Sequence, residues 1–156
     1  MGSRQAVAKE EIMSPTEIAR EYFDCWNRRD WEKYRSLMHP QYSYTGGDGR
    51  EQKGPEAGLA VGQMFASAFP DARITITNLR ADGDFVTTEF TGTGTHKGDL
   101  MGVAPTNKKV SIPVCNVMEL RDGRIYRERE YMDMMHMMTQ VGAMKAPAAV
   151  KARQTT

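Results

Sequence analysis

The chain is poor in cysteine and contains no motif that binds a metal ion or a phosphate group. Its two cysteines, Cys25 and Cys115, lie far apart, so we expect reduced thiols in the core, with a disulfide as the alternative. No CxxC, no HExxH and no cluster of histidines and carboxylates occurs, which leaves a metal site without support. A glycine-rich phosphate loop and a dinucleotide fingerprint are also missing.

The chain has no excess of positive or negative charge. It contains 21 lysines and arginines and 20 aspartates and glutamates, which gives a formal net charge of +1. No basic run alternates with aromatic residues, so nucleic acid and anionic membrane surfaces are not expected partners. No run of about eighteen apolar residues occurs that could span a bilayer. The first residues, MGSRQAVAKEEIM, lack the apolar core of a signal peptide, and we expect a flexible arm over 1–13 and a cytoplasmic protein.

What remains is the composition of one globular domain. A chain of 156 residues, 40% hydrophobic and 26% charged, can bury a single core, which we expect over 14–144. The tail over 145–156, KAPAAVKARQTT, has no apolar period and is predicted to be disordered. Methionine is abundant, with 12 copies, and clusters in 132–144, where it suits either an irregular core or an adaptable pocket wall.

Three helices are predicted before the main run of strands. The segment 14–17, SPTE, combines a hydroxyl cap, a proline at the first helical position and a glutamate that closes a capping box. Asp30 is placed to cap a second helix through Met38, which His39-Pro40 should end. A third helix is predicted over 54–69, because Gly-Pro-Glu opens it and a proline follows it.

Four strands are predicted after the helices, over 73–79, 85–95, 109–120 and 124–131, with tight turns at DGD and DG, and the methionine-rich segment then turns helical. Helices followed by antiparallel strands predict an α+β domain. One sheet curled around the helices would leave an apolar pocket open at one end. The third strand carries apolar residues on both faces, which predicts that a second subunit covers the outer face.

The segment 94–106, GTHKGDLMGVAPT, resembles the GTHxGxxxGxxPT motif of SnoaL-like polyketide cyclases and their ester-cyclase relatives, which have the nuclear transport factor 2-like fold. Shorter pieces agree in order and spacing. They are 23–27 ahead of Asp30, HPQY at 39–42, FPDAR at 69–73, DGRI at 122–125 and EYMD at 130–133. The ordered set covers about residues 15–144.

The resemblance implies a cone-shaped fold, in which a curled antiparallel sheet packs on N-terminal helices around an apolar pocket. It also implies a homodimer or a higher homo-oligomer. Characterised members close a polyketide ring by intramolecular aldol condensation, without a metal ion or a cofactor, and a carboxylate at the mouth of the last strand moves the proton. The partner implied for this chain is a small hydrophobic or aromatic molecule.

Carried over by position, the family's catalytic aspartate falls on Glu130, and its pocket histidine falls on Asn116. The pocket aromatic of the first helix falls on Trp26, and the asparagine after the HPxY motif falls on Tyr44. Glutamate for aspartate keeps the acid–base function but moves the carboxylate by about one methylene. Asparagine for histidine removes a group that titrates near neutrality and leaves only hydrogen bonding, which puts the anthracycline-type substrate of the characterised members in question.

The last predicted strand contains Arg127-Glu128-Arg129-Glu130, whose alternation sends the glutamates to one face and the arginines to the other. If the glutamates face the pocket, desolvation raises the pKa of Glu130 into the range of a general base and acid. Such a base suits proton abstraction next to a carbonyl, with Asn116 or Tyr44 donating to the enolate oxygen. We predict catalytic roles for Glu130 and Asn116, and substrate contacts for Trp26, Tyr44, Val61, Phe65, His96, Met118 and Met132.

Each role has an alternative. Glu130 could pair with an arginine across the sheet, His96 could make a structural hydrogen bond, and Asp133 fits the N-cap of the C-terminal helix. For the whole protein, a cyclase, isomerase or lyase stands against a non-catalytic module that binds a lipid-like or aromatic ligand. Epoxide hydrolysis lacks a clear Asp-Arg-Asp set. A buried Glu130 without a cationic partner favours catalysis, whereas a paired one favours a structural role.

Overall fold

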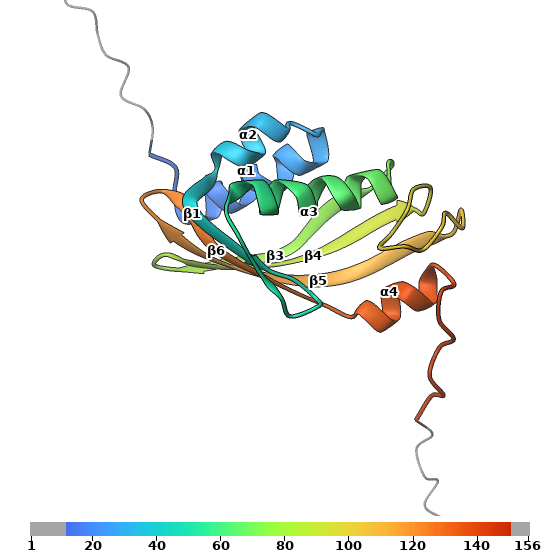
Figure 1. The fold of residues 1–156 in the computed structure, drawn as a ribbon. Coiled ribbons are helices and arrows are strands. Elements are labelled where there is room, and N and C mark those ends of the chain that lie inside the picture. The colour runs from blue at the N-terminus through green and yellow to red at the C-terminus, as the bar shows by residue number, and fades with distance from the viewer. Residues whose placement is uncertain (1–11, 151–156) are drawn as a thin grey trace, which may run out of the picture.

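The computed structural model describes residues 12–150, which form a six-stranded sheet curled beneath three helices (Figure 1). The helices are α1 (Pro15–Arg28), α2 (Trp31–Ser36) and α3 (Pro55–Ala68). The strands are β1 (Met38–Thr45), β2 (Glu51–Lys53), β3 (Arg73–Asp82), β4 (Phe85–Thr95), β5 (Lys109–Arg121) and β6 (Arg124–Met132), in the spatial order β2-β1-β6-β5-β4-β3. All neighbours are antiparallel except β1 and β6, and the predicted α+β architecture is confirmed.

Local sequence sets the start of α1 as predicted. The Ser14 hydroxyl accepts from the Glu17 backbone N–H at 3.3 Å, and Glu17 Oε2 accepts from the Ser14 N–H at 2.7 Å, which completes the capping box. The helix ends at Arg28 and is capped by Arg29, whose φ of 61° turns the chain. Its apolar face, with Tyr22 and Trp26, is buried against the sheet and α3.

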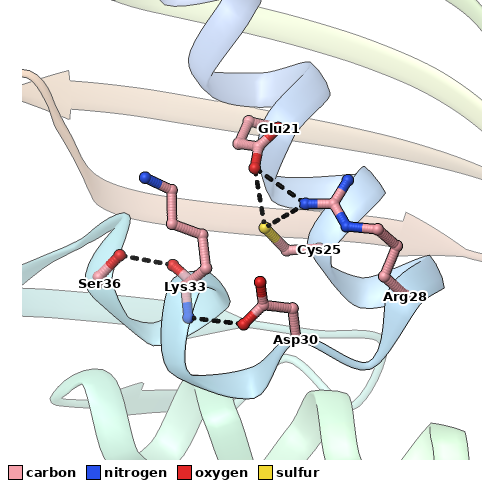
Figure 2. A network of polar contacts seen from close by, with 6 residues as sticks. All are labelled: Glu21, Cys25, Arg28, Asp30, Lys33 and Ser36. Carbon is pink, nitrogen blue, oxygen red and sulfur yellow. Dashed lines mark hydrogen bonds and ion pairs between the residues drawn. The ribbon is translucent and has the colours of Figure 1, made fainter.

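Polar contacts hold the turn between α1 and α2, as Figure 2 shows. Asp30 caps α2 by accepting from the Lys33 N–H at 3.1 Å. Arg28 lies 3.0 Å from the Glu21 carboxylate, and the Cys25 thiol donates to the same carboxylate at 3.3 Å. Burial and the bond to Glu21 raise the pKa of Cys25 to about 12, so the thiol stays protonated near neutral pH. Both cysteines of the chain are free thiols, as expected.

Strands β1 and β2 correct the prediction for the segment between the second and third helices. Helix α2 ends at Ser36 rather than at Met38, and His39-Pro40 lies inside β1 instead of ending a helix. The proline is tolerated because β1 pairs with β6 at Met38 and again from Ser43, with an irregular stretch between them that needs no N–H from residue 40. The glycine-rich segment that follows turns back to form β2.

A bulge in β6 decides which of its side chains face inward. The pairing of β5 with β6 slips by one residue at Tyr126. As a result Ile125 and Glu128 are both buried, although they lie three positions apart. Glu130 follows on the same inner face, and Arg129 lies on the outer face, as the alternation predicted.

The C-terminal helix α4 (Met134–Gln140) lies beside the part of β5 that β6 does not reach (Figure 1). Asp133 caps it, as predicted, by accepting from a backbone N–H of the first turn at 2.9 Å. Gln140 accepts from the Ser111 N–H at 2.7 Å and donates to the Ser111 carbonyl at 3.0 Å. These backbone groups would otherwise need a neighbouring strand, so one side chain substitutes for the end of β6.

The terminal segments lie largely outside the described residues. Of the arm expected over 1–13, residues 1–11 lie outside the described part of the chain. Of the tail expected over 145–156, residues 151–156 lie outside it. Residues 145–150 form neither helix nor strand and are exposed. Within 12–150, no helix has the length and apolar character needed to cross a bilayer. The homodimer stays a prediction, since the structure describes one chain.

The loop that carries GTHKGDLMGVAPT is anchored on the end of α3. The Gly98 N–H donates to the Ala68 carbonyl at 3.0 Å. Gly98 lies so close to α3 that an added Cβ would overlap the Ser67 carbonyl oxygen. His96 is fully buried beside this anchor, with Nδ1 3.0 Å from Thr106 Oγ1. The motif glycine and histidine therefore hold the loop to the helix.

We predict that Gly98→Ala destabilises the fold by about 1–3 kcal/mol, because its Cβ meets backbone that cannot move aside cheaply. Gly92→Ala is the matched control in β4, where the nearest atom to an added Cβ is the Ile112 carbonyl oxygen at 4.0 Å. Urea denaturation of both variants measures the difference. Equal midpoints for the two variants would contradict the anchoring role of Gly98.

Candidate active site

The helices and the curled sheet enclose a cavity of about 110 Å³. Its wall is mostly apolar and aromatic, with contributions from Phe23, Trp26, Phe65, Phe90, Ile112 and Val114. The ionisable carboxylates in the wall are Glu128 and Glu130 of β6, and Arg73 at the start of β3 is its basic residue. The cavity therefore combines an apolar body with a concentrated acidic spot.

Glu128 lies deepest, with 2% of its surface exposed. The Tyr22 hydroxyl of α1 donates to Glu128 Oε2 at 2.7 Å, and the Tyr42 hydroxyl of β1 donates to the same oxygen. The Asn116 amide of β5 donates to Oε1 at 2.7 Å. Burial raises the pKa of Glu128 above its ordinary value, and the three hydrogen-bond donors oppose that rise.

Glu130 lies two residues further along β6 and is partly exposed. The Tyr44 hydroxyl of β1 donates to Oε2 at 3.0 Å, and Asn116 donates to Oε1 at 3.2 Å. Burial, followed by the charge of Glu128, raises the pKa of Glu130 to about 7, while the bonds from Tyr44 and Asn116 work in the other direction. A carboxyl group with this pKa gives and takes a proton readily at neutral pH.

A single amide nitrogen bridges the two carboxylates. Asn116 is fully buried and pairs with Glu130 across the β5–β6 ladder, so its Nδ2 reaches both acids. Its Oδ1 has no hydrogen-bond partner among the described residues. The same holds for the buried hydroxyl of Thr88 on β4, the residue opposite Asn116 in the β4–β5 ladder. An unpaired buried polar atom costs about 1–3 kcal/mol.

Neither carboxylate has a cationic partner in the part of the chain that the structure describes. Within residues 12–150, none of the ion pairs involves Glu128 or Glu130. Arg129, which lies between them in sequence, pairs with Glu119 on the outer face at 2.6 Å. The alternative in which Glu130 pairs with an arginine across the sheet is therefore not supported. Both acids rely on neutral hydrogen-bond donors.

The structure brings most of the predicted contact residues to the cavity. Its wall includes Trp26, Tyr44, Val61, Phe65 and Met132, and Asn116 lies behind the carboxylates that it bonds. The Trp26 indole N–H donates to the Gly62 carbonyl at 3.0 Å, which fixes the ring. His96 and Met118 lie away from the wall. His96 packs on Phe69 in the loop anchor, and Met118 is fully buried in the core on β5.

Sequence reasoning put Glu128 on the same face as Glu130 but gave it no role, and it did not place Tyr22 and Tyr42 in the site. Tyr22 looks like one more apolar residue on the buried face of a helix, and Tyr42 falls in a segment where no strand was predicted. One signal was available, because four of the six tyrosines fall before residue 45. Tyrosine combines a large apolar ring with a hydroxyl donor, which is what a buried carboxylate needs.

The side chains around the carboxylates hold and move protons. Within the described part of the chain, no three or more His, Cys, Asp or Glu side chains are grouped so that they could hold a metal ion. The groups within hydrogen-bond distance of Glu128 and Glu130 are tyrosine hydroxyls and one amide. The arrangement is suited to proton transfer to and from a bound molecule.

Residues 16–141 match the family described as SnoaL-like polyketide cyclase. The aklanonic acid methyl ester cyclase AcmA of Streptomyces galilaeus is 23% identical over 125 residues, which are 79% of this chain and 87% of AcmA. IdmH of Streptomyces antibioticus, a candidate polyketide cyclase, is 27% identical with a TM-score of 0.74, over 83% of this chain and 99% of IdmH. A Catenulispora acidiphila protein with a ketosteroid isomerase-like fold is 20% identical with a TM-score of 0.70, over 81% of this chain and 92% of that protein.

The family match spans all the elements that build the cavity, from α1 to α4. It includes both carboxylates, the bridging amide and the anchored glycine-rich loop. The cone-shaped architecture agrees with that of the solved structures. The chain belongs to the SnoaL-like polyketide cyclase family and is a cyclase-type small-molecule enzyme.

Proposed function

We propose that the protein closes a ring in a ketone-bearing, polyketide-like substrate by intramolecular aldol condensation, with Glu130 as general base and then general acid. The observation that carries the proposal is the position of Glu130, a carboxylate in the wall of an apolar cavity that forms no ion pair with any of the described residues. The pKa of about 7 supports the same role, because a catalytic base works best near the operating pH. Family membership supports the reaction class.

The reaction needs two proton movements and one new carbon–carbon bond. Glu130 removes a proton from the carbon next to one carbonyl, which leaves an enolate. The enolate carbon attacks a second carbonyl of the same molecule, and the proton on Glu130 passes to the resulting alkoxide oxygen. The product is an isomer of the substrate, so the step consumes no further reactant.

Tyr44 is better placed than Asn116 to stabilise the enolate. Both donate to Glu130 in the structure, Tyr44 at 3.0 Å and Asn116 at 3.2 Å. Once Glu130 has taken the proton its oxygens accept more weakly, and the Tyr44 hydroxyl can turn to the enolate oxygen. Asn116 remains bonded to Glu128 at 2.7 Å. We therefore assign the enolate contact to Tyr44 and the orientation of Glu130 to Asn116.

The cavity favours a flat apolar group next to the carboxylate. Its volume of about 110 Å³ is smaller than the roughly 300–1,000 Å³ of pockets that enclose drug-sized ligands. A substrate of several rings must therefore extend out of the closed part, past the exposed Arg73 and Thr93 in the wall. The aromatic wall at Trp26 and Phe65 suits the part that stays inside.

The proposal predicts that Glu130→Gln lowers turnover by about two to four orders of magnitude while ligand affinity changes little, because the amide keeps the size and loses the titratable proton. Aklanonic acid methyl ester, the compound named for AcmA, is the first substrate to assay. Glu89→Gln is the matched control, since Glu89 is exposed on β4 and its carboxylate accepts from the Asn78 amide at 3.2 Å, away from the cavity. A Glu130→Gln variant that melts well below wild type yet binds and turns over normally would contradict the catalytic role.

Stability should depend on pH through the same carboxyl group. The folded-state pKa of about 7 lies above the ordinary 4.5, so the folded state binds this proton more tightly than the unfolded state does. The resulting stabilisation is complete below about pH 4.5 and is lost as the pH rises to about 7, a change of up to about 3 kcal/mol. Glu130→Gln should therefore melt like wild type at pH 4.5 and several degrees higher at pH 8. Parallel melting curves across this range would contradict the raised pKa.

A further inference from the structure

Glu128 has no role in the reaction as written, although the site is built around it. Its 2% exposure and three donors make it the most enclosed charged side chain of the described residues. The donors come from three separate elements, α1, β1 and β5. Burying a carboxyl group without a cation costs free energy. If this position only filled space, an apolar residue would stabilise the fold more than Glu128 does.

The geometry favours an ionised Glu128. Two tyrosine hydroxyls, of Tyr22 and Tyr42, converge on one oxygen, Oε2, and the Asn116 amide occupies the other. A proton on Oε2 would point at one of the two hydroxyls and reverse the direction of that bond, and a proton on Oε1 would face an amide N–H. An ionised carboxylate accepts all three bonds at once, and bonds to an ionised acceptor are the stronger ones.

Glu130 is linked to this group through one atom. Asn116 Nδ2 lies 2.7 Å from Glu128 Oε1 and 3.2 Å from Glu130 Oε1. Two carboxylates this close cannot easily be ionised together, so a negative charge on the inner one makes the outer one hold its proton more tightly. Glu130 faces the cavity with fewer donors, and so it is the member that exchanges the proton.

We propose that Glu128 is a positioning residue: a fixed anion, held by Tyr22, Tyr42 and Asn116, whose charge sets the proton affinity of Glu130. The inference rests on the proposed role of Glu130 as general base. The raised pKa of Glu130 agrees with it, since the charge of Glu128 is the second cause of the shift after burial.

The other groups that face the pair do not provide this charge. From α1, α2 and β1 the ionisable groups are Tyr22, Tyr34, Tyr42 and Tyr44, whose pKa values burial raises above 10, so they stay neutral. Helices α3 and α4 present apolar residues to the cavity, β5 presents Asn116, and Arg73 of β3 forms no ion pair with either acid. Glu128 is thus the charged group that acts on Glu130 at close range.

The test is a thermal-unfolding cycle of four proteins from pH 4 to 9: wild type, Glu130→Gln, Glu128→Gln and the double variant. In the wild-type background, Glu130→Gln becomes stabilising as the pH rises to about 7. In the Glu128→Gln background, Glu130→Gln should again become stabilising as the pH rises. The rise should be complete about one pH unit or more lower than in the wild-type background, and the gain in melting temperature should be smaller. Identical ranges in both backgrounds would overturn the proposal.

Two further readouts separate this inference from a purely structural role. In a pH–rate profile, Glu128→Gln should move the acid limb to lower pH, whereas Tyr44→Phe should move it to higher pH, because it removes a donor that favours ionised Glu130. Glu128→Asp keeps the charge and should leave the limb near the wild-type position. A loss of rate with an unmoved limb, or a Glu128→Gln protein that does not fold, would contradict the proposal.

The two claims fail differently. If Glu130→Gln keeps its turnover, the proposed function is wrong, whatever the melting cycle shows. If Glu130→Gln abolishes turnover but the melting cycle shows no coupling, Glu130 remains the base and the role assigned to Glu128 is wrong. The melting cycle needs no substrate, so it can be completed before the substrate is known.

Discussion

Two carboxylates on one strand lie in the interior of the cone with hydrogen-bond donors around them, and no cation among residues 12–150 lies within ion-pair distance. A buried carboxylate loses its hydration, and hydrogen bonds to its oxygen atoms must offset that cost. The hydroxyls of Tyr22, Tyr42 and Tyr44 and the amide of Asn116 meet that requirement. Because these donors come from α1, β1 and β5, the site exists only when the helices and the sheet are assembled.

The sheet geometry keeps the donors and the acids on the same side. Strand β1 runs parallel to β6, and Tyr44 pairs with Glu128 in that ladder, so the inward side chains of the two strands alternate together. The irregular stretch around Pro40 and the bulge at Tyr126 each shift one of these strands relative to its partner. Such irregularities re-aim side chains near functional sites. In β6 the bulge places Ile125 and Glu128, three positions apart, on the same inner face.

Much of the architecture could be predicted from short-range patterns. The capping box at Ser14, the turns after β3 and β5, and the alternation in β6 act through neighbouring residues, and the structure confirms them. What local patterns could not show is the tolerance for Pro40 inside a strand, which depends on where β6 lies. Neither could they show that His96 serves a loop anchor, or that Tyr22 and Tyr42 converge on one oxygen from positions twenty residues apart in the chain. These features depend on long-range packing.

The central claim is that Glu130 is a carboxyl group whose proton exchanges near neutral pH. The most direct measurement is an NMR titration of the protein with ¹³C-labelled glutamate side chains, in which the Glu130 carboxyl signal is assigned by its loss in Glu130→Gln. The account predicts a titration midpoint near 7 for this one signal. A Glu130 midpoint near 4.5, in a protein that is fully folded, would contradict it.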